Sequence, residues 1–86
     1  HTLSAAGATG TIGPNLDVRL RTDCHSAASK RVRGAQLKQC IFTAITKPYA
    51  YLPPGYGAGI MPSSFAQTLT STQIASLVNF LASVAK

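Results

Sequence analysis

Residues 59–86, GIMPSSFAQTLTSTQIASLVNFLASVAK, contain the clearest helical signal in the chain. Thr70 is a good N-cap residue, and Gln73 follows it at the spacing of a capping box. The apolar residues after the cap recur with the period of an amphipathic helix: Ile74, Leu77, Val78, Leu81 and Val84, with Phe80 widening the stripe. The pattern predicts a terminal helix. So broad an apolar face must be covered by a missing segment, a flat cofactor or another chain.

Working back along the chain, residues 35–46, AQLKQCIFTAIT, also repeat apolar residues at helical spacing. We expect this helix to end at Lys47-Pro48, because proline disfavours a helical residue before it. Residues 48–62 contain four of the five prolines and three of the seven glycines. This composition excludes a helix or a central strand. Its tyrosines are candidate packing anchors: Tyr49, Tyr51 and Tyr56.

The first third of the chain has weaker patterns. Residues 1–13 begin like the tail of a helix and continue into small residues and glycines, and GPNLD (13–17) is typical of a turn. Residues 18–34 show no sustained period, so we expect an irregular segment with one short helical turn near 27–30. No strand pattern is present. The chain is therefore predicted to form a single all-α domain over 1–86, with long loops.

The 86 residues are few enough that one apolar core is only marginally stabilising. The formal net charge is +6, because eight basic residues oppose only Asp17 and Asp23. Such a surface attracts acidic partners, although a solvated basic loop is an equally plain interpretation. We expect no nucleic-acid binding, since few aromatic residues interleave with the charges as stacking platforms. Most of the basic residues lie in one segment, 19–38: Arg19, Arg21, Lys30, Arg31, Arg33 and Lys38.

Two cysteines, Cys24 and Cys40, lie sixteen positions apart. In an oxidising compartment a disulfide between them would stabilise so small a domain. Two unpaired buried thiols are the alternative, and we favour the bridge.

Met61, the only methionine, is followed by a proline and lies just before the terminal helix. Methionines often fill gaps in a core. The order of the motifs favours another role: HTL at residues 1–3, GPNLD at 13–17, MPSSF at 61–65, and then the capped helix. This order resembles that of class I c-type cytochromes, from the histidine of their haem-attachment motif onward. The resemblance is good over 13–17 and 48–86, fair over 1–10 and almost absent over 18–36.

The resemblance implies a small cytochrome c-like helical domain around haem c, with iron held by His1 as the proximal and Met61 as the distal ligand. The carbonyl of Pro14 would accept the ring N–H of His1 and orient it. His/Met ligation raises the reduction potential. The implied apolar walls of the haem crevice are Ile12, Leu16, Ile60 and Phe65.

The chain departs from the family in lacking Cys-x-x-Cys before His1 and the first helix. We therefore expect an upstream segment that supplies both. Cys24-His25 is a conceivable single-thioether site, but it follows the GPNL turn instead of preceding it, and a solvated His25 is the simpler interpretation. Likewise, the simpler interpretation of His1 is an exposed terminus. A terminal histidine can also chelate copper, but no second histidine is suitably placed here.

We expect an electron carrier and not an enzyme, since both axial positions are taken and no catalytic motif is present. A c-type haem and a disulfide indicate a periplasmic or extracellular location. The expected partners are redox proteins with an acidic docking surface, and another chain or segment over the terminal helix. No apolar run is long enough to span a membrane, so membrane association would require a partner or a missing segment. The alternative function is a cofactor-free basic interaction module whose terminal helix docks on a partner.

Overall fold

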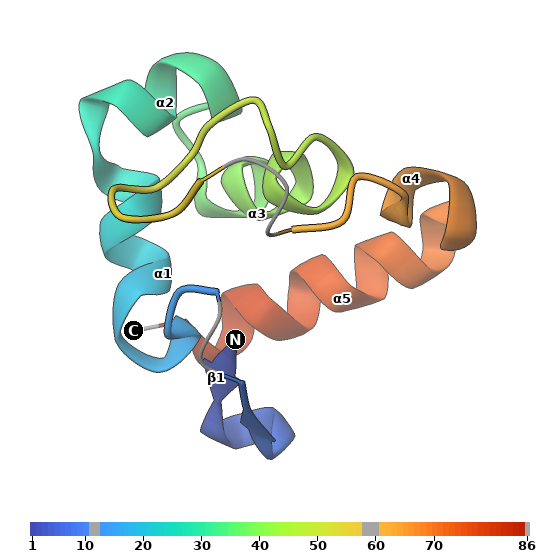
Figure 1. The fold of residues 1–86 in the computed structure, drawn as a ribbon. Coiled ribbons are helices and arrows are strands. Elements are labelled where there is room, and N and C mark those ends of the chain that lie inside the picture. The colour runs from blue at the N-terminus through green and yellow to red at the C-terminus, as the bar shows by residue number, and fades with distance from the viewer. Residues whose placement is uncertain (11–12, 58–60, 86) are drawn as a thin grey trace.

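The computed structural model describes residues 1–10, 13–57 and 61–85 and is mostly helical (Figure 1). The helical class predicted from the sequence is therefore confirmed, with a small β-hairpin added at the start. The elements in chain order are β1 (Thr2–Leu3), the 3₁₀ turn η1 (Ser4–Ala6), β2 (Ala8–Thr9), α1 (Leu16–His25), α2 (Ala27–Arg33), α3 (Leu37–Thr46), α4 (Phe65–Thr68) and α5 (Ser71–Val84).

Helix α5 begins with the capping box expected from the sequence. The N–H of Gln73 donates to Thr70 Oγ1 over 3.1 Å, and the N–H of Thr70 donates to Gln73 Oε1 over 2.9 Å. These two bonds satisfy N–H groups that a helix start otherwise leaves without partners. The apolar face is only partly buried: Ile74 and Val78 are 6% exposed, whereas Leu77 and Phe80 are 36% and 39% exposed.

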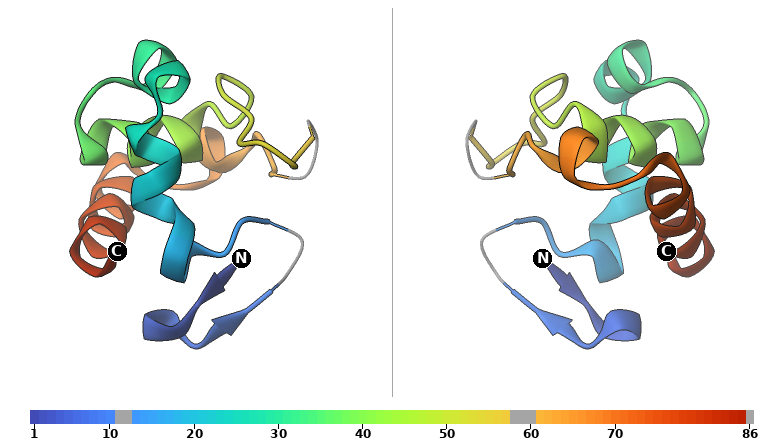
Figure 2. Two further views of the ribbon diagram at one scale, coloured as in Figure 1. Left: turned by 90° about the vertical axis from the view of Figure 1, so that its left-hand side faces the viewer. Right: turned by 90° about the vertical axis from the view of Figure 1, so that its right-hand side faces the viewer.

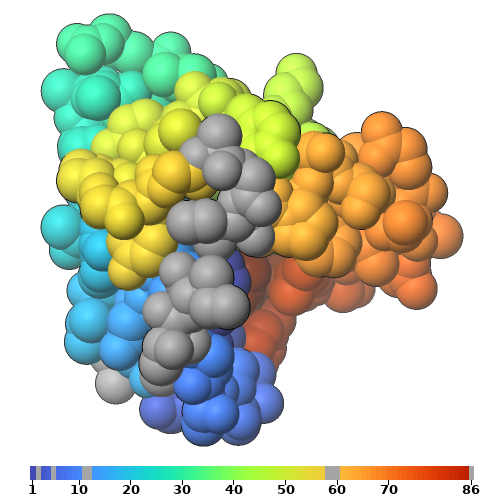
Figure 3. All heavy atoms as spheres, viewed as in Figure 1, coloured from blue at the N-terminus to red at the C-terminus, as the bar shows by residue number. Residues whose placement is uncertain are grey.

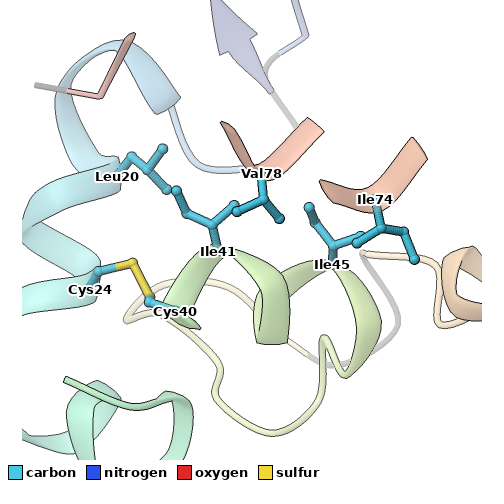
Figure 4. Close-up of a cluster of buried hydrophobic side chains, with 7 residues drawn as sticks. All are labelled: Leu20, Cys24, Cys40, Ile41, Ile45, Ile74 and Val78. Carbon is cyan, nitrogen blue, oxygen red and sulfur yellow. A yellow bond between two sulfur atoms is a disulfide. The ribbon is translucent and has the colours of Figure 1, made fainter. Parts of the chain in front are cut away.

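Helix α3 supplies the cover for the buried part of α5. It ends at Thr46, before Lys47-Pro48, as predicted. Figure 4 shows Ile41 and Ile45 of α3 pointing toward Val78 and Ile74 of α5. The expectation that α5 needs cover from outside this chain is therefore wrong for Ile74 and Val78.

Residues 18–34 correct the sequence interpretation, because the structure has two helices there, α1 and α2, in place of an irregular segment. Asn15 caps α1 by accepting from the N–H of Asp17 (2.9 Å), and Ser26 caps α2 by accepting from the N–H of Ser29 (3.1 Å). The buried stripe of α1 is narrow, because Leu20 and Cys24, one turn apart, are its only buried residues. So narrow a stripe in a charged sequence does not reach the apolar repeat by which a helix is recognised.

The first ten residues are a second correction, since they form an antiparallel hairpin and no helix tail. Thr2 pairs with Thr9 and Leu3 with Ala8, on either side of η1. Two-residue strands are too short to show an alternating pattern in the sequence. The carboxylate of Asp17 accepts hydrogen bonds from the N–H (2.9 Å) and hydroxyl (2.7 Å) of Ser4, which tie the hairpin to the start of α1.

The two views of Figure 2 show that the hairpin lies beside the start of α1, while the proline-rich segment lies nearer its other end. The described parts of that segment, 48–57 and 61–62, contain no helix or strand, as predicted. A disulfide joins Cys24 of α1 to Cys40 of α3, with 5.9 Å between their Cα atoms. The favoured bridge is therefore present, and it holds together two of the helices that surround the core.

We predict that removing this disulfide with Cys24→Ser/Cys40→Ser lowers the free energy of unfolding by about 3 kcal/mol, because a loop of this length restricts the unfolded chain by about that amount. The measurement is urea unfolding of the oxidised chain and the double variant. As a control, reductant should shift the midpoint of the parent protein and leave that of the variant unchanged. Equal midpoints for the two oxidised proteins would contradict the bridge.

Candidate cofactor site

A cavity of about 570 Å³ lies between α1, α3, α5 and the proline-rich segment. Its volume is within the range of roughly 300–1,000 Å³ that is usual for ligand and cofactor sites. Figure 3 shows the proline-rich segment, in yellow, lying over the face of the molecule between α1 and α4. Much of the lining is aliphatic: Leu20, Ile41, Ala44, Ile45, Leu77 and Leu81. The volume and lining therefore suit a ligand that is mainly apolar.

His1 lines this cavity, and its ring orientation is set by one hydrogen bond. The ring Nδ1 lies 2.8 Å from the carbonyl oxygen of Pro14, which also lines the cavity. A carbonyl oxygen can only accept, so Nδ1 must carry the hydrogen. In the neutral ring, Nε2 then has a free lone pair, which is the form that binds a metal. The contact expected between His1 and Pro14 is thus present in the structure.

Gly13 leaves the space that the His1 ring occupies. A Cβ atom at Gly13 would lie 2.7 Å from Cε1 and 2.8 Å from Nδ1 of that ring, closer than real Cβ contacts allow. A Cβ atom at Gly10 would similarly lie 2.9 Å from the backbone nitrogen of His1. The glycines of the sequence TGTIGP therefore have a steric role in seating His1.

Met61, Leu16 and Phe65 line the same cavity as His1 and Pro14. Segments from both ends of the chain are thus brought to one site, with an imidazole and a thioether on its wall. Ile12 and Ile60, the other two expected wall residues, lie outside the described residues. His25 is exposed at the end of α1. Since Cys24 is bonded to Cys40, it has no thiol for a thioether, which removes the Cys24-His25 alternative.

Two arginines hold the proline-rich segment against α1 and α2. The guanidinium of Arg33 lies 4.5 Å from the ring centroid of Tyr51, and that of Arg19 lies 5.1 Å from the ring centroid of Tyr56. Both distances are within the range of cation–π attraction. The Tyr51 hydroxyl also shares a hydrogen bond with Ser26 Oγ at 3.3 Å. Tyr51 and Tyr56 are thus the anchors expected from the sequence, whereas Tyr49 is 52% exposed.

The basic segment 19–38 is divided between the surface and the interior. Arg21, Lys30, Arg31 and Lys38 are exposed, but Arg33 is only 7% exposed. Burial lowers the pKa of Arg33, with the nearby Tyr51 and Asp23 opposing that change. The hydrogen bond and ion pair with Asp23, 3.2 Å long, raise the pKa of Arg19. Sequence reasoning missed the separate environment of Arg33, because nothing in RVRG distinguishes it from its neighbours.

The described residues contain no group of three or more His, Cys, Asp or Glu side chains placed to hold a metal ion. Their helices include none that is long and apolar enough to cross a bilayer. Comparison with protein-family models, with curated proteins and with solved structures found no match for this chain.

We predict that Gly13→Ala displaces the His1 ring and breaks its hydrogen bond to Pro14, a loss of about 1 kcal/mol. Two-bond ¹H–¹⁵N NMR correlations of the imidazole should show the Nδ1–H tautomer in the parent chain and a tautomer mixture in the variant. Gly57→Ala is the matched control, because a Cβ atom there meets nothing within 4 Å. The same tautomer in all three proteins would show that Gly13 does not seat the ring.

Proposed function

We propose that this chain is a single-electron carrier that holds a haem in the cavity, with the iron between Nε2 of His1 and the sulfur of Met61. The observation that carries the proposal is the His1–Pro14 hydrogen bond at the wall of an apolar cavity that Met61 also lines. It prepares one ring nitrogen to donate its lone pair. A soft thioether is a suitable second ligand for haem iron. When bound, the haem would supply a metal that changes between ferric and ferrous by one electron.

The chain's own residues would keep the two oxidation states similar in structure. Pro14 holds His1 in one tautomer, while Tyr51 and Tyr56 fasten the proline-rich segment that precedes Met61. The wall from α3 and α5 would present aliphatic side chains to the bound haem. A site with two protein ligands leaves the metal no open position for a substrate. These features favour electron transfer over catalysis.

Covalent attachment of the haem would need thiols from outside this sequence. The chain has two cysteines, and they are bonded to each other. The resemblance to c-type cytochromes therefore requires attachment cysteines upstream of His1, whereas a haem held only by coordination and burial requires none. The disulfide is compatible with the periplasmic or extracellular location that we propose.

The surface charge supports an acidic redox partner. Both carboxylates of the chain make internal contacts, Asp17 with Ser4 and Asp23 with Arg19. The exposed basic side chains of segment 19–38 are therefore little offset by acidic groups on the surface. Their field would raise the association rate of an acidic protein surface at low salt.

A cofactor-free interaction module is the second candidate, and the exposure of α5 supports it. Leu77 and Phe80 are 36% and 39% exposed, on a helix whose buried residues, Ile74 and Val78, pack against α3. An apolar surface on another protein could cover them. The two candidates differ in colour, since a haem protein has a strong Soret absorption and the module has none.

We predict that Met61→Leu and Met61→Ala both abolish the weak sulfur-to-iron absorption band in the far red of the haem-loaded chain. Both should lower the reduction potential by on the order of 0.1 V, a fraction of the roughly 0.8 V range that axial ligands span. Met61→Leu preserves the size and apolarity of the side chain, so its loss of the band reports the sulfur alone. A band that persists in Met61→Leu would contradict ligation by Met61.

We also predict that electron exchange with ferricyanide, an anion, slows several-fold between about 10 mM and 150 mM salt, as the screening length falls from about 30 Å to about 8 Å. Stopped-flow absorbance measures this rate. A cationic cobalt complex is the control, and its rate should rise over the same range. Rates that do not depend on salt would remove the proposed steering.

A further inference from the structure

Arg33 places a buried positive charge on the wall of the largely apolar cavity, which Asp23 also lines. Its position is well determined by its neighbours. The Nε–H donates to Ser29 Oγ over 2.8 Å, and Nη2 donates to the backbone carbonyl of Asp23 over 3.3 Å. The ring of Tyr51 lies beside the guanidinium, and Ser29 is fully buried. The side chain is therefore held in place before any ligand arrives.

The contacts of Arg33 leave hydrogen-bond donors and charge uncompensated. A guanidinium has five N–H donors, and the two bonds to Ser29 and Asp23 use two of them. Both acceptors are neutral oxygens. The carboxylate of Asp23 forms an ion pair with Arg19. Among the described residues, no carboxylate forms an ion pair with Arg33. Arg19, Arg33 and Asp23 together therefore carry one positive charge in excess.

A buried charge without an ionic partner is costly, so a compensating anion is expected nearby. The planar guanidinium is suited to a carboxylate, which it can hold through two parallel hydrogen bonds. Within the described residues, the two carboxylates, Asp17 and Asp23, are engaged elsewhere. A compensating anion would then come from a bound molecule.

We propose that Arg33, stacked on Tyr51, binds a carboxylate of the molecule that occupies the cavity. The inference rests on the proposed function, in which this molecule is a haem and the carboxylate is one of its propionates. Arg33 ends α2, whereas His1 lies at the hairpin beside the start of α1. Two attachment points on different walls would fix how the ring is turned about the axis through its iron. The carboxylate-bearing edge would face the α2 end of the cavity.

The test uses metal-free protoporphyrin IX and its dimethyl ester, because neither probe gains affinity from iron ligation. Both are titrated by fluorescence into the 86-residue chain, which we expect to bind the free acid more tightly than the ester. Arg33→Gln should weaken binding of the acid about tenfold or more and leave binding of the ester unchanged, since a hydrogen bond to a charged group is worth that much. Arg31→Gln, an exposed residue of the same helix, should change neither.

The outcomes separate this inference from the function on which it rests. If the parent chain is folded and binds neither haem nor either porphyrin, the haem proposal fails and takes this inference with it. If it binds haem but neither porphyrin, the role of Arg33 alone is overturned. If both porphyrins bind and Arg33→Gln weakens them equally or not at all, only the role of Arg33 is overturned. Arg33 also borders a shallow outer hollow beside Lys38 and Phe42. If Arg33 instead bound a solvent anion in that hollow, the chain would bind the acid and the ester in the cavity equally well.

A second measurement on the parent chain covers the case in which Arg33→Gln fails to fold. The ¹H–¹⁵N signal of Arg33 Nε should shift when the free acid binds and stay in place when the ester binds. The proposal would be overturned if the signal shifted equally with both probes, or if both probes bound and the signal did not move.

Discussion

The hydrogen bond between the His1 ring and the carbonyl oxygen of Pro14 is the interaction on which the candidate site depends. A carbonyl can only accept, so this bond selects the tautomer and leaves Nε2 unprotonated in the neutral ring. Gly13 makes the bond possible, because a side chain there would overlap the imidazole. Asp17 supports it from further away by tying the hairpin that carries His1 to the start of α1. Local turn chemistry thus sets the tautomer and orientation of the His1 ring, as the proposed ligand role requires.

The rest of the fold provides a frame around the His1 ring. Helices α1 and α3 are joined by the Cys24–Cys40 disulfide, and α3 packs on α5 through Ile41 and Ile45. Leu77 and Leu81 of α5 line the cavity, Leu81 while also packing against the core and Leu77 while remaining 36% exposed. A chain of this size has little apolar surface to spare. A large apolar ligand in the cavity would therefore extend the core and add to the stability of the fold.

Sequence patterns predicted the elements in which local signals are strong. The capping box at Thr70 and Gln73, the end of α3 before Pro48 and the irregular proline-rich segment follow from short-range rules. The contact of His1 with Pro14 was implied by the resemblance to c-type cytochromes, and the structure contains it. The roles of His1 and Met61 stay predictions. Helices α1 and α2 were missed because their inward faces are narrow and their sequence is rich in arginine. The hairpin was missed because its strands have only two residues each.

The burial of Arg33 could not be predicted from the sequence. In the sequence it is one of several basic residues, and net charge alone assigns it to the surface. In the structure Ser29, Tyr51 and the backbone of Asp23 enclose it beside the cavity. These partners come from α1, α2 and the proline-rich segment, so only the tertiary arrangement brings them together. Long-range packing, and not local composition, decides whether such a charge steers a partner or binds a ligand.

X-ray absorption at the iron edge of the haem-loaded chain tests the central claim most directly, because it reports the atoms bound to the metal. The account predicts one sulfur and five nitrogen neighbours, the nitrogens being four from the porphyrin and one from His1. A first shell of nitrogen and oxygen atoms alone, with no sulfur, would contradict it.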